Sequence, residues 1–318
     1  MKAPWLLLLV AYGAQAADPL PPDAAAGWLQ RMADASRHLA YKGVFVFQHG
    51  DAPVQSLLVT NRPVGSGKDS SLKAMDGAPR EVRCSPGMSI SRLTEGGQIK
   101  VERRLNSRHF PDLLPANAAS LVNWYEVKLG DIARVAGLDC RQVELEPKDA
   151  YRWGYVLCAD KDTALPLKAV MVNEAGHPLM QYAFAEIKFG PMSKASPAPV
   201  PAPNVSDAAQ PVATERVDVR NLPPGFTRIT AVKRRLPNKP GEVEHWVFSD
   251  GLTHISLFLE NATHPIETLR GQSQLGMINM LTRQVGNMQA TVLGDAPWPA
   301  VEAIATNLEA RPSDGAPR

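Results

Sequence analysis

Cysteines are the residues of this sequence whose types and spacing most directly predict chemistry. The chain carries three, Cys84, Cys140 and Cys158. One is left over if two of them form a disulfide. We predict a Cys140–Cys158 disulfide, because both residues lie on the flanks of one predicted β-hairpin; the alternative that Cys84 bonds to one of them stays open. No Cys-x-x-Cys spacing occurs, which argues against a thiol oxidoreductase.

The seven histidines are scattered, and only His245 and His254 lie on neighbouring predicted strands. Zinc requires three or four ligands, and no cysteine or third histidine is placed to complete such a set. The G-S-G-K stretch at residues 65–68 lacks the first glycine of a phosphate-binding loop, so we expect an exposed turn there. Motifs of hydrolases, metalloproteases and dinucleotide-binding proteins are missing. The sequence therefore predicts no cofactor and no enzyme, although a hydrolase whose residues are distant in sequence stays an alternative.

Aromatic residues gather on the predicted strands of the first 190 residues. A curved sheet with one apolar aromatic face must cover that face. Either this face is a core covered by a helix over 23–39 and by one or two short helices within 110–122, or it forms a concave apolar pocket for a lipid chain. The candidate pocket residues are Phe45, Phe47, Trp124, Trp153, Tyr155 and Tyr182.

Two clusters of basic residues are candidate contacts for phosphates or for an acidic peptide. The first is Arg103 and Arg104 with Arg108 nearby, and the second is Lys233, Arg234 and Arg235. A solvated strand edge is the simpler explanation of either cluster. The formal net charge of +2 is too small to favour nucleic acid binding.

The best-defined element is the hairpin that carries two of the cysteines, over residues 137–158. Both flanks alternate with period two around a short connection. The predicted register pairs residues whose numbers sum to 298: Val143 with Tyr155, Leu145 with Trp153, Glu146 with Arg152, and Cys140 with Cys158. This register separates an apolar face from a face with an ion pair and the cysteines, and a one-residue slip would mix the two sets. Strands over 165–172 and 179–188 are expected to continue the meander.

Length and composition predict two soluble domains and an export signal. The 318 residues are 44% hydrophobic and 21% charged, which is ordinary for globular proteins. A basic start, an apolar core over residues 5–12 and the A-Q-A of residues 14–16 predict a signal peptide cleaved after Ala16. Residues 191–211 hold six prolines and predict an extended linker. We therefore expect a domain over 17–190, a linker over 191–215 and a second domain over 216–318, closed by a helix over 299–309.

The chain resembles the RseB/MucB family along nearly the whole mature sequence. No single stretch is diagnostic, but the order and spacing of the stretches, the export signal and the proline-rich linker together are specific. The matching stretches are residues 41–47 (YKGVFVF), 75–82 (MDGAPREV), 151–155 (YRWGY), 162–167 (DTALPL), 222–226 (LPPGF), 249–251 (SDG) and 291–295 (TVLGD).

The resemblance implies an α+β fold, with an N-terminal unclosed antiparallel β-barrel with helices, similar to LolA and LolB, and a smaller C-terminal α+β domain. It also implies a periplasmic negative regulator of extracytoplasmic sigma-factor signalling. Such a protein binds the periplasmic region of a membrane-spanning anti-sigma factor, protects it from proteolysis and is released by lipid or lipopolysaccharide. A homo-oligomer is compatible with this role. The alternative is a periplasmic carrier of lipids or lipoproteins that uses the same pocket.

Overall fold

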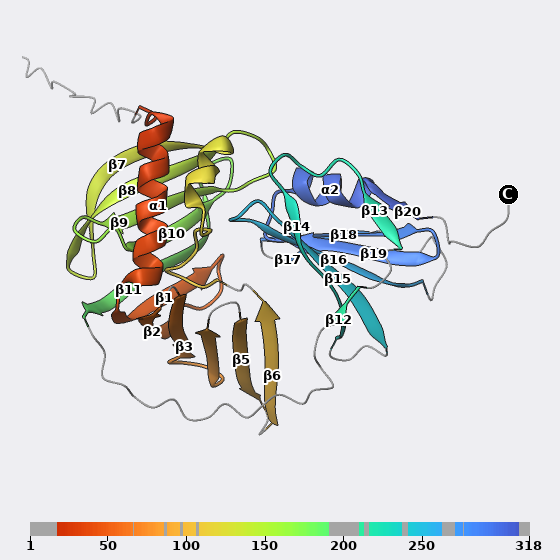
Figure 1. The fold of residues 1–318 in the computed structure, drawn as a ribbon, viewed down its shortest axis with the longest axis horizontal. Coiled ribbons are helices and arrows are strands. Elements are labelled where there is room, and N and C mark those ends of the chain that lie inside the picture. Colours follow the sequence, from red (N-terminus) through yellow and green to blue (C-terminus); the bar gives the residue numbers. More distant parts are fainter. Residues whose placement is uncertain are drawn as a thin grey trace, which may run out of the picture.

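The computed structural model describes residues 18–311, apart from 66, 86–87, 96–97, 106–107, 191–209, 213–215, 237–240, 263–270 and 276. The predicted signal peptide and most of the predicted linker therefore lie outside the described residues. Within the described part, no helix combines the length and the apolar character needed to cross a membrane. The described chain forms two large sheets, each with its own apolar core, and a two-stranded sheet of β13 and β20 (Figure 1).

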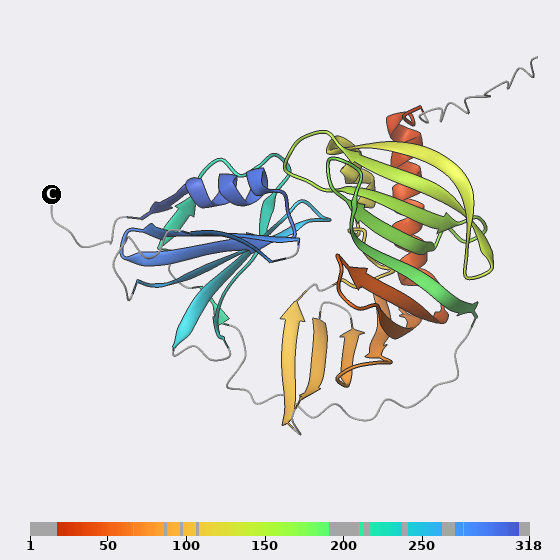
Figure 2. The same cartoon turned by 180° about the vertical axis from the view of Figure 1, so that it is seen from behind.

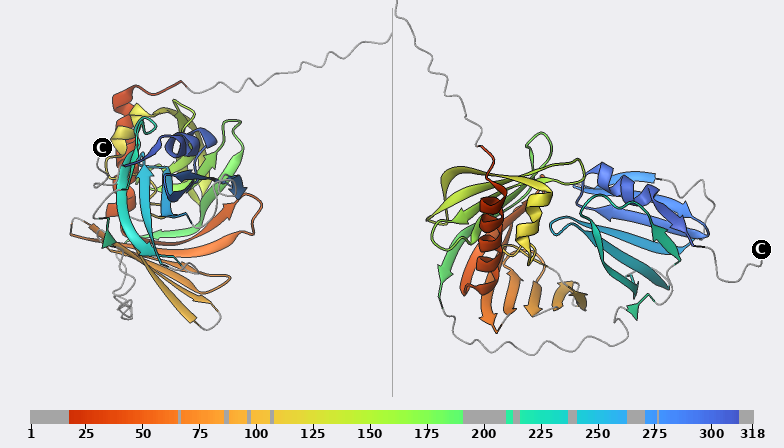
Figure 3. Two further views of the ribbon diagram at one scale, coloured as in Figure 1. Left: turned by 90° about the vertical axis from the view of Figure 1, so that its right-hand side faces the viewer. Right: turned by 45° about the horizontal axis from the view of Figure 1, so that its top comes forward.

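The first sheet has eleven antiparallel strands in the order β6-β5-β4-β3-β2-β1-β11-β10-β9-β8-β7. Its edge strands, β6 and β7, do not pair with each other in the described part, so the sheet curls without closing into a barrel (Figure 3). This confirms the predicted unclosed antiparallel barrel. Its strands are β1 Tyr41–His49, β2 Gln55–Val64, β3 Gly67–Ala74, β4 Arg80–Ser85, β5 Met88–Glu95, β6 Gln98–Leu105, β7 Tyr125–Val135, β8 Leu138–Pro147, β9 Gly154–Asp160, β10 Pro166–Val172 and β11 Pro178–Phe189.

Helix α1, Pro22–His38, crosses the concave side of this sheet beside the short 3-10 helix η1, Ala118–Asn123 (Figures 1 and 3). Proline in the first turn presets the helical φ angle, and the basic residues of the last turn complement the helix dipole. The fully buried Leu29 and Met32 form its apolar stripe. Burying side chains of this size contributes roughly 1.5–3 kcal/mol each, so packing against the sheet holds the helix in place.

The β8–β9 hairpin forms at the predicted place, but the predicted register is wrong by two residues. Val143 pairs with Leu157 and Leu145 with Tyr155, so partner numbers sum to 300. A two-residue slip keeps every side chain on its own face, so the apolar pattern cannot distinguish the two registers. Trp153 lies in the connecting loop and not in a strand.

The disulfide joins Cys140 and Cys158 across this hairpin, with their Cα atoms 5.3 Å apart. In the observed register Cys140 pairs with Asp160 and Gln142 with Cys158, so the two cysteines are diagonal neighbours. Both are buried in the first core. Cys84, on β4, is the free cysteine.

Of the one or two short helices predicted within residues 110–122, one is observed, at the C-terminal end of this segment. Only η1 is helical, and residues 108–117, here called the strap, cross the mouth of the curved sheet without regular structure. Pro111 and Pro115 lack a backbone N–H and interrupt helical hydrogen bonding. The buried carboxyl group of Asp112 anchors the strap, since it lies 2.9 Å from Nη2 of Arg37 and 2.5 Å from Nζ of Lys68.

The second domain is a seven-stranded sheet in the order β12-β14-β15-β16-β19-β18-β17, with helix α2, Trp298–Thr306, over one face (Figures 1 and 2). The predicted closing helix over 299–309 ends early, because residues from Leu308 pair as strand β20 with β13. The strands are β12 Gln210–Pro211, β13 Val217–Val219, β14 Thr227–Arg235, β15 Glu242–Ser249, β16 His254–Asn261, β17 Gly271–Leu275, β18 Ile278–Val285, β19 Met288–Gly294 and β20 Leu308–Ala310.

Candidate functional site at the domain joint

A cluster of four aromatic rings lines the concave side of the first sheet. Phe45 of β1 and Tyr182 and Phe184 of β11 come from adjacent paired strands. The fourth ring, Phe110, comes from the strap. It lies 5.2 Å from Tyr182 with the two planes at 3°, and 5.0 Å from Phe45 with an edge-on geometry. Such pairs add roughly 0.5–1.5 kcal/mol beyond their apolar burial, so the strap is firmly seated on the sheet.

A cavity of about 150 Å³ lies next to this cluster, between the two domains. Tyr155 and Tyr182 line it from the first sheet, together with Met171 and Met180, which are flexible and polarisable side chains. Leu252, His254 and Asp295 line it from the second domain, and the strap contributes Arg108 and Leu113. Residues from both domains are therefore needed to form the cavity.

The charged groups of the cavity are affected by burial. Burial raises the pKa of Asp295 to about 6. Burial and the nearby cation Arg108 lower the pKa of His254, and burial lowers the pKa of Arg108 itself. One guanidinium nitrogen of Arg108 donates to the carbonyl oxygen of Gly251, while its buried Nε makes no hydrogen bond to the described residues. The cavity thus combines apolar walls with one available cationic donor.

A buried arginine, Arg152, connects the two domains beside the cavity. We call this region, where residues of the two domains pack around Arg152 and the cavity, the domain joint. Nε of Arg152, from the β8–β9 loop, lies 2.6 Å from Oδ2 of Asp250 in the β15–β16 loop. The same guanidinium also donates to Asp149 and to the carbonyl oxygen of Pro224. The Cζ atom of Arg152 lies 4.9 Å from the ring centroid of Trp124, in the first domain, and 5.2 Å from that of Phe226, in the second domain.

Close packing at this joint leaves little free space. A Cβ atom on Gly225, which has a positive φ of 80°, would lie 2.4 Å from the ring of Trp124. The joint therefore requires glycine at this position. Leu252 and Met277 of the second domain belong to the apolar core of the first.

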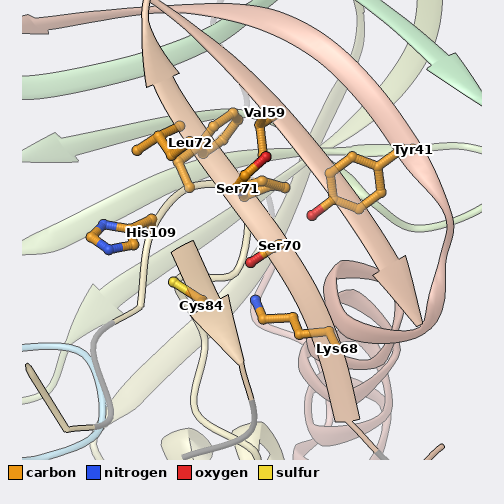
Figure 4. A pocket seen from close by; sticks show the side chains of 10 residues that line it. Tyr41, Val59, Lys68, Ser70, Ser71, Leu72, Cys84 and His109 are labelled. Atoms are coloured by element: carbon orange, nitrogen blue, oxygen red, sulfur yellow. The ribbon is translucent and has the colours of Figure 1, made fainter. Parts of the chain in front are cut away.

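A second, much smaller hollow of about 20 Å³ is lined by the strap residues His109, Phe110 and Pro111 together with strand residues (Figure 4). Cys84 faces it with Lys68, Ser70 and His109. Burial raises the pKa of the Cys84 thiol, and the nearby Lys68 offsets only part of this effect. A thiol with a raised pKa is a poor nucleophile.

The structure brings together some of the predicted pocket residues and separates others. Phe45, Phe47 and Tyr182 form one ring cluster, and Tyr155 lines the cavity with Tyr182. Trp124 instead packs under Arg152 in the joint. Trp153 packs against the first core from its loop, outside the cavity lining.

The predicted basic clusters do not meet. Lys233, Arg234 and Arg235 lie on β14, where the first and last pair across the ladder with Glu244 and Glu242. Arg103 and Arg104 lie on the edge strand β6, and their side chains are outside the described part. Their predicted neighbour Arg108 is not on a solvated edge but in the domain joint.

His245 and His254 lie on the neighbouring strands β15 and β16, as expected, but each has a different partner across the ladder. His245 stacks on Phe258 with ring centroids 4.3 Å apart, whereas His254 lines the cavity. Within the described residues, no three side chains of the metal-ligating types gather closely enough to hold an ion.

The cavity at the domain joint is suited to binding an amphipathic molecule, whose apolar part would lie against the tyrosines and methionines of its wall.

Three residues of this region are not identifiable from the sequence: Phe110, Arg152 as an interdomain residue, and Asp295. Phe110 lay in a region predicted as helix, and Arg152 was predicted to pair with Glu146 within the hairpin. Glu146 instead contacts Nζ of Lys128 at 2.5 Å. The partners of these residues lie far away in the chain, so no local pattern could have identified them.

The sequence matches two family descriptions, the MucB/RseB N-terminal domain over residues 24–210 and the MucB/RseB C-terminal domain over residues 212–309. Among curated proteins, it is 29% identical to the sigma factor AlgU regulatory protein MucB of Pseudomonas aeruginosa, over 97% of this chain and 98% of the relative. It is 25% identical to the sigma-E factor regulatory protein RseB of Escherichia coli K12, with the same coverage.

Solved structures agree with these sequence matches. The structure resembles the one described as the complex of Pseudomonas aeruginosa MucA and MucB, with a TM-score of 0.70, 27% identity and coverage of 91% of this chain and 100% of the other. It also resembles a crystal structure of MucB, with a TM-score of 0.60, 25% identity and coverage of 91% of this chain and 98% of that one. The second domain is thus part of the shared architecture.

Proposed function

Because the chain belongs to the MucB/RseB family, we propose that it regulates an extracytoplasmic sigma factor by binding the periplasmic region of a membrane-spanning anti-sigma factor. The bound anti-sigma factor is protected from the protease that starts its degradation. A relative that shares both domains is described in complex with the periplasmic part of its partner MucA, which supports this partner class.

The proposed location is the periplasm, after cleavage of the signal peptide behind Ala16. The Cys140–Cys158 disulfide supports an oxidising compartment, because such bonds persist outside the cytosol and are rare within it. Binding and regulation, without catalysis of its own, are the proposed activities of the mature chain.

The proposed ligand is a lipid or lipopolysaccharide that binds in the cavity at the domain joint. The observation that carries this proposal is that both domains line the same cavity. A molecule that occupies it must have different affinities for different arrangements of the two domains. By linkage, its binding then changes the affinity for any partner that contacts both domains. Phosphate groups would meet Arg108, whose Nε has no described hydrogen-bond acceptor.

The candidate lipid-pocket residues remain Phe45, Phe47, Tyr155 and Tyr182, with Trp124 and Trp153 at its periphery. The basic residues of β6 and β14, Arg103, Arg104, Lys233, Arg234 and Arg235, are proposed partner or phosphate contacts. A simple lipid carrier is less well supported, because a carrier needs only one domain, whereas residues of both domains line this cavity.

The test is a pull-down of the mature chain from a periplasmic extract with detergent-solubilised membranes, analysed by mass spectrometry. We expect an anti-sigma factor in near-equal amount. The Arg103→Glu/Arg104→Glu and Lys233→Glu/Arg235→Glu variants should recover less of it. Recovery of lipids or lipoproteins without an anti-sigma factor would contradict the regulator and favour the carrier.

A further inference from the structure

The cavity at the domain joint is too small for the ligand class that the chain is proposed to bind. Its volume of about 150 Å³ suits one benzene-sized group, whereas pockets for drug-sized ligands have roughly 300–1,000 Å³. A whole acyl chain can therefore be buried there only if a side chain now inside the concave face moves out.

Phe110 is the side chain that occupies the adjacent space. It is only 2% exposed, and its ring lies 5.0–5.2 Å from those of Phe45, Tyr182 and Phe184. The other three rings belong to strands held by the sheet ladder. Phe110 alone belongs to the irregular strap, so it can leave without breaking a strand pairing.

Residues of the strap line both hollows. Phe110 faces the hollow of about 20 Å³ near Cys84, and Arg108 and Leu113 face the larger cavity. The ring of Phe110 stacks on Tyr182, which lines that larger cavity. Removal of the ring would therefore extend the cavity along the aromatic face.

The strap connects this ring to the second domain. At its start, Arg108 donates a hydrogen bond to the carbonyl oxygen of Gly251. Further along, the Pro115 ring packs closely against Gly251: a Cβ atom added to this glycine would lie only 3.1 Å from Cγ of Pro115. A displacement of Phe110 would thus be transmitted to the β15–β16 loop, which also contains Asp250, the partner of Arg152.

We propose that Phe110 is a plug that determines the size of ligand the concave face accepts, and that the strap transmits its displacement to the second domain. This proposal rests on the proposed lipid ligand. An acyl chain that replaces the ring restores apolar contacts to Phe45, Tyr182 and Phe184, so the exchange leaves the aromatic face covered. The strap then shifts, and its contacts with Gly251 are the first interdomain contacts to change.

The test compares the unaltered mature chain with Phe110→Ala in a titration with cis-parinaric acid, a fatty acid that fluoresces in apolar sites. We expect Phe110→Ala to bind the fatty acid more tightly, by about five-fold or more, because binding no longer has to displace the phenyl ring. This is the usual size of a coupling between binding and a conformational change. Phe110→Leu should show a smaller gain and carries the comparison if Phe110→Ala does not fold. Phe248→Leu, in the core of the second domain, is the matched control and should bind as the unaltered chain does.

Hydrogen exchange at residues 249–254 tests the transmission. In the unaltered chain, bound cis-parinaric acid should raise the exchange rate there, because the ring must leave. In Phe110→Ala, saturation with cis-parinaric acid should raise the exchange rate at these residues less than in the unaltered chain, although this variant binds the fatty acid more tightly. A merely structural role for Phe110 does not predict this opposite change of affinity and response.

Two results would overturn the plug. If the unaltered chain binds the fatty acid and both Phe110 variants bind it equally or less tightly, the plug is wrong while the lipid ligand stands. If none of the three chains binds the fatty acid, the plug and the proposed lipid ligand are both wrong. The proposal that the chain binds an anti-sigma factor is then still tested separately by the pull-down.

Discussion

Arg152 and Asp250 form an ion pair between the two domains in which both side chains are 0% exposed, with Nε and Oδ2 2.6 Å apart. A buried charge is costly unless its partner and further hydrogen bonds compensate it. Here Arg152 also reaches Asp149 and Pro224, and Asp250 accepts hydrogen bonds from the backbone N–H groups of Leu252 and Thr253. The pair therefore fixes one arrangement of the domains.

Replacing Arg152 by methionine should lower the free energy of unfolding of the mature chain by about 3–5 kcal/mol, because Asp250 is then left buried without its cation. Urea denaturation followed by tryptophan fluorescence measures the change. The double variant Arg152→Met/Asp250→Leu should recover part of the loss, since it removes both charges.

The matched control is Arg220→Met, which breaks the pair of Arg220 with Glu309. Those side chains are 66% and 53% exposed, and exposed pairs contribute about 0–1 kcal/mol. A loss of similar size for Arg152→Met and Arg220→Met would show that the buried pair does not hold the joint.

The disulfide should stabilise the first domain. Its cysteines are 18 residues apart, and closure of a loop of this size contributes roughly 3 kcal/mol in the chain-entropy model. The Cys140→Ala/Cys158→Ala variant, or reduction of the unaltered chain, should lower the free energy of unfolding by about that amount. Thiol titration of the denatured, unreduced protein should find a single reactive cysteine, Cys84; three would contradict the pairing.

Stability should depend on pH through Asp295. Burial raises its pKa from the ordinary 3.8 to about 6, so the folded protein prefers the protonated carboxyl. Ionisation of Asp295 therefore costs stability above pH 6, and this cost disappears as the pH falls from about 6 toward 4. His254, Arg108 and Asp250 face the same region, and the lowered pKa of His254 acts in the opposite sense.

The Asp295→Asn variant isolates this carboxyl, because the neighbouring groups are the same in both proteins. At pH 7.5 it should unfold with a free energy roughly 1–3 kcal/mol larger than that of the unaltered chain. At pH 4.5 the difference should be much smaller. Urea denaturation at the two pH values measures it, and a difference independent of pH would contradict the raised pKa.

Local patterns in the sequence predict much of the first sheet and its helix. The helix predicted over 23–39 is observed at Pro22–His38, because an apolar stripe at helical spacing is a local property. The hairpin is also predicted at its place, since alternation with period two determines which side chains share a face. Its register is not determined in this way, because a shift of two residues preserves the alternation.

The domain joint could not be predicted from the sequence. Arg152 has a possible partner six residues earlier, Glu146, and the sequence offers no reason to prefer Asp250, 98 residues later. Phe110 and Arg108 lie in a segment whose structure depends on contacts with α1, β3 and the second domain. The aromatic face was recognised, but which ring covers it is decided by tertiary packing.

The most direct test of the regulator is calorimetric titration of the mature chain with the periplasmic domain of the anti-sigma factor from the same organism. The titration is made without lipid and then with a phosphate-bearing lipid in micelles. We expect a complex of defined stoichiometry whose affinity falls when the lipid is present. No binding, or equal affinity with and without the lipid, would contradict it.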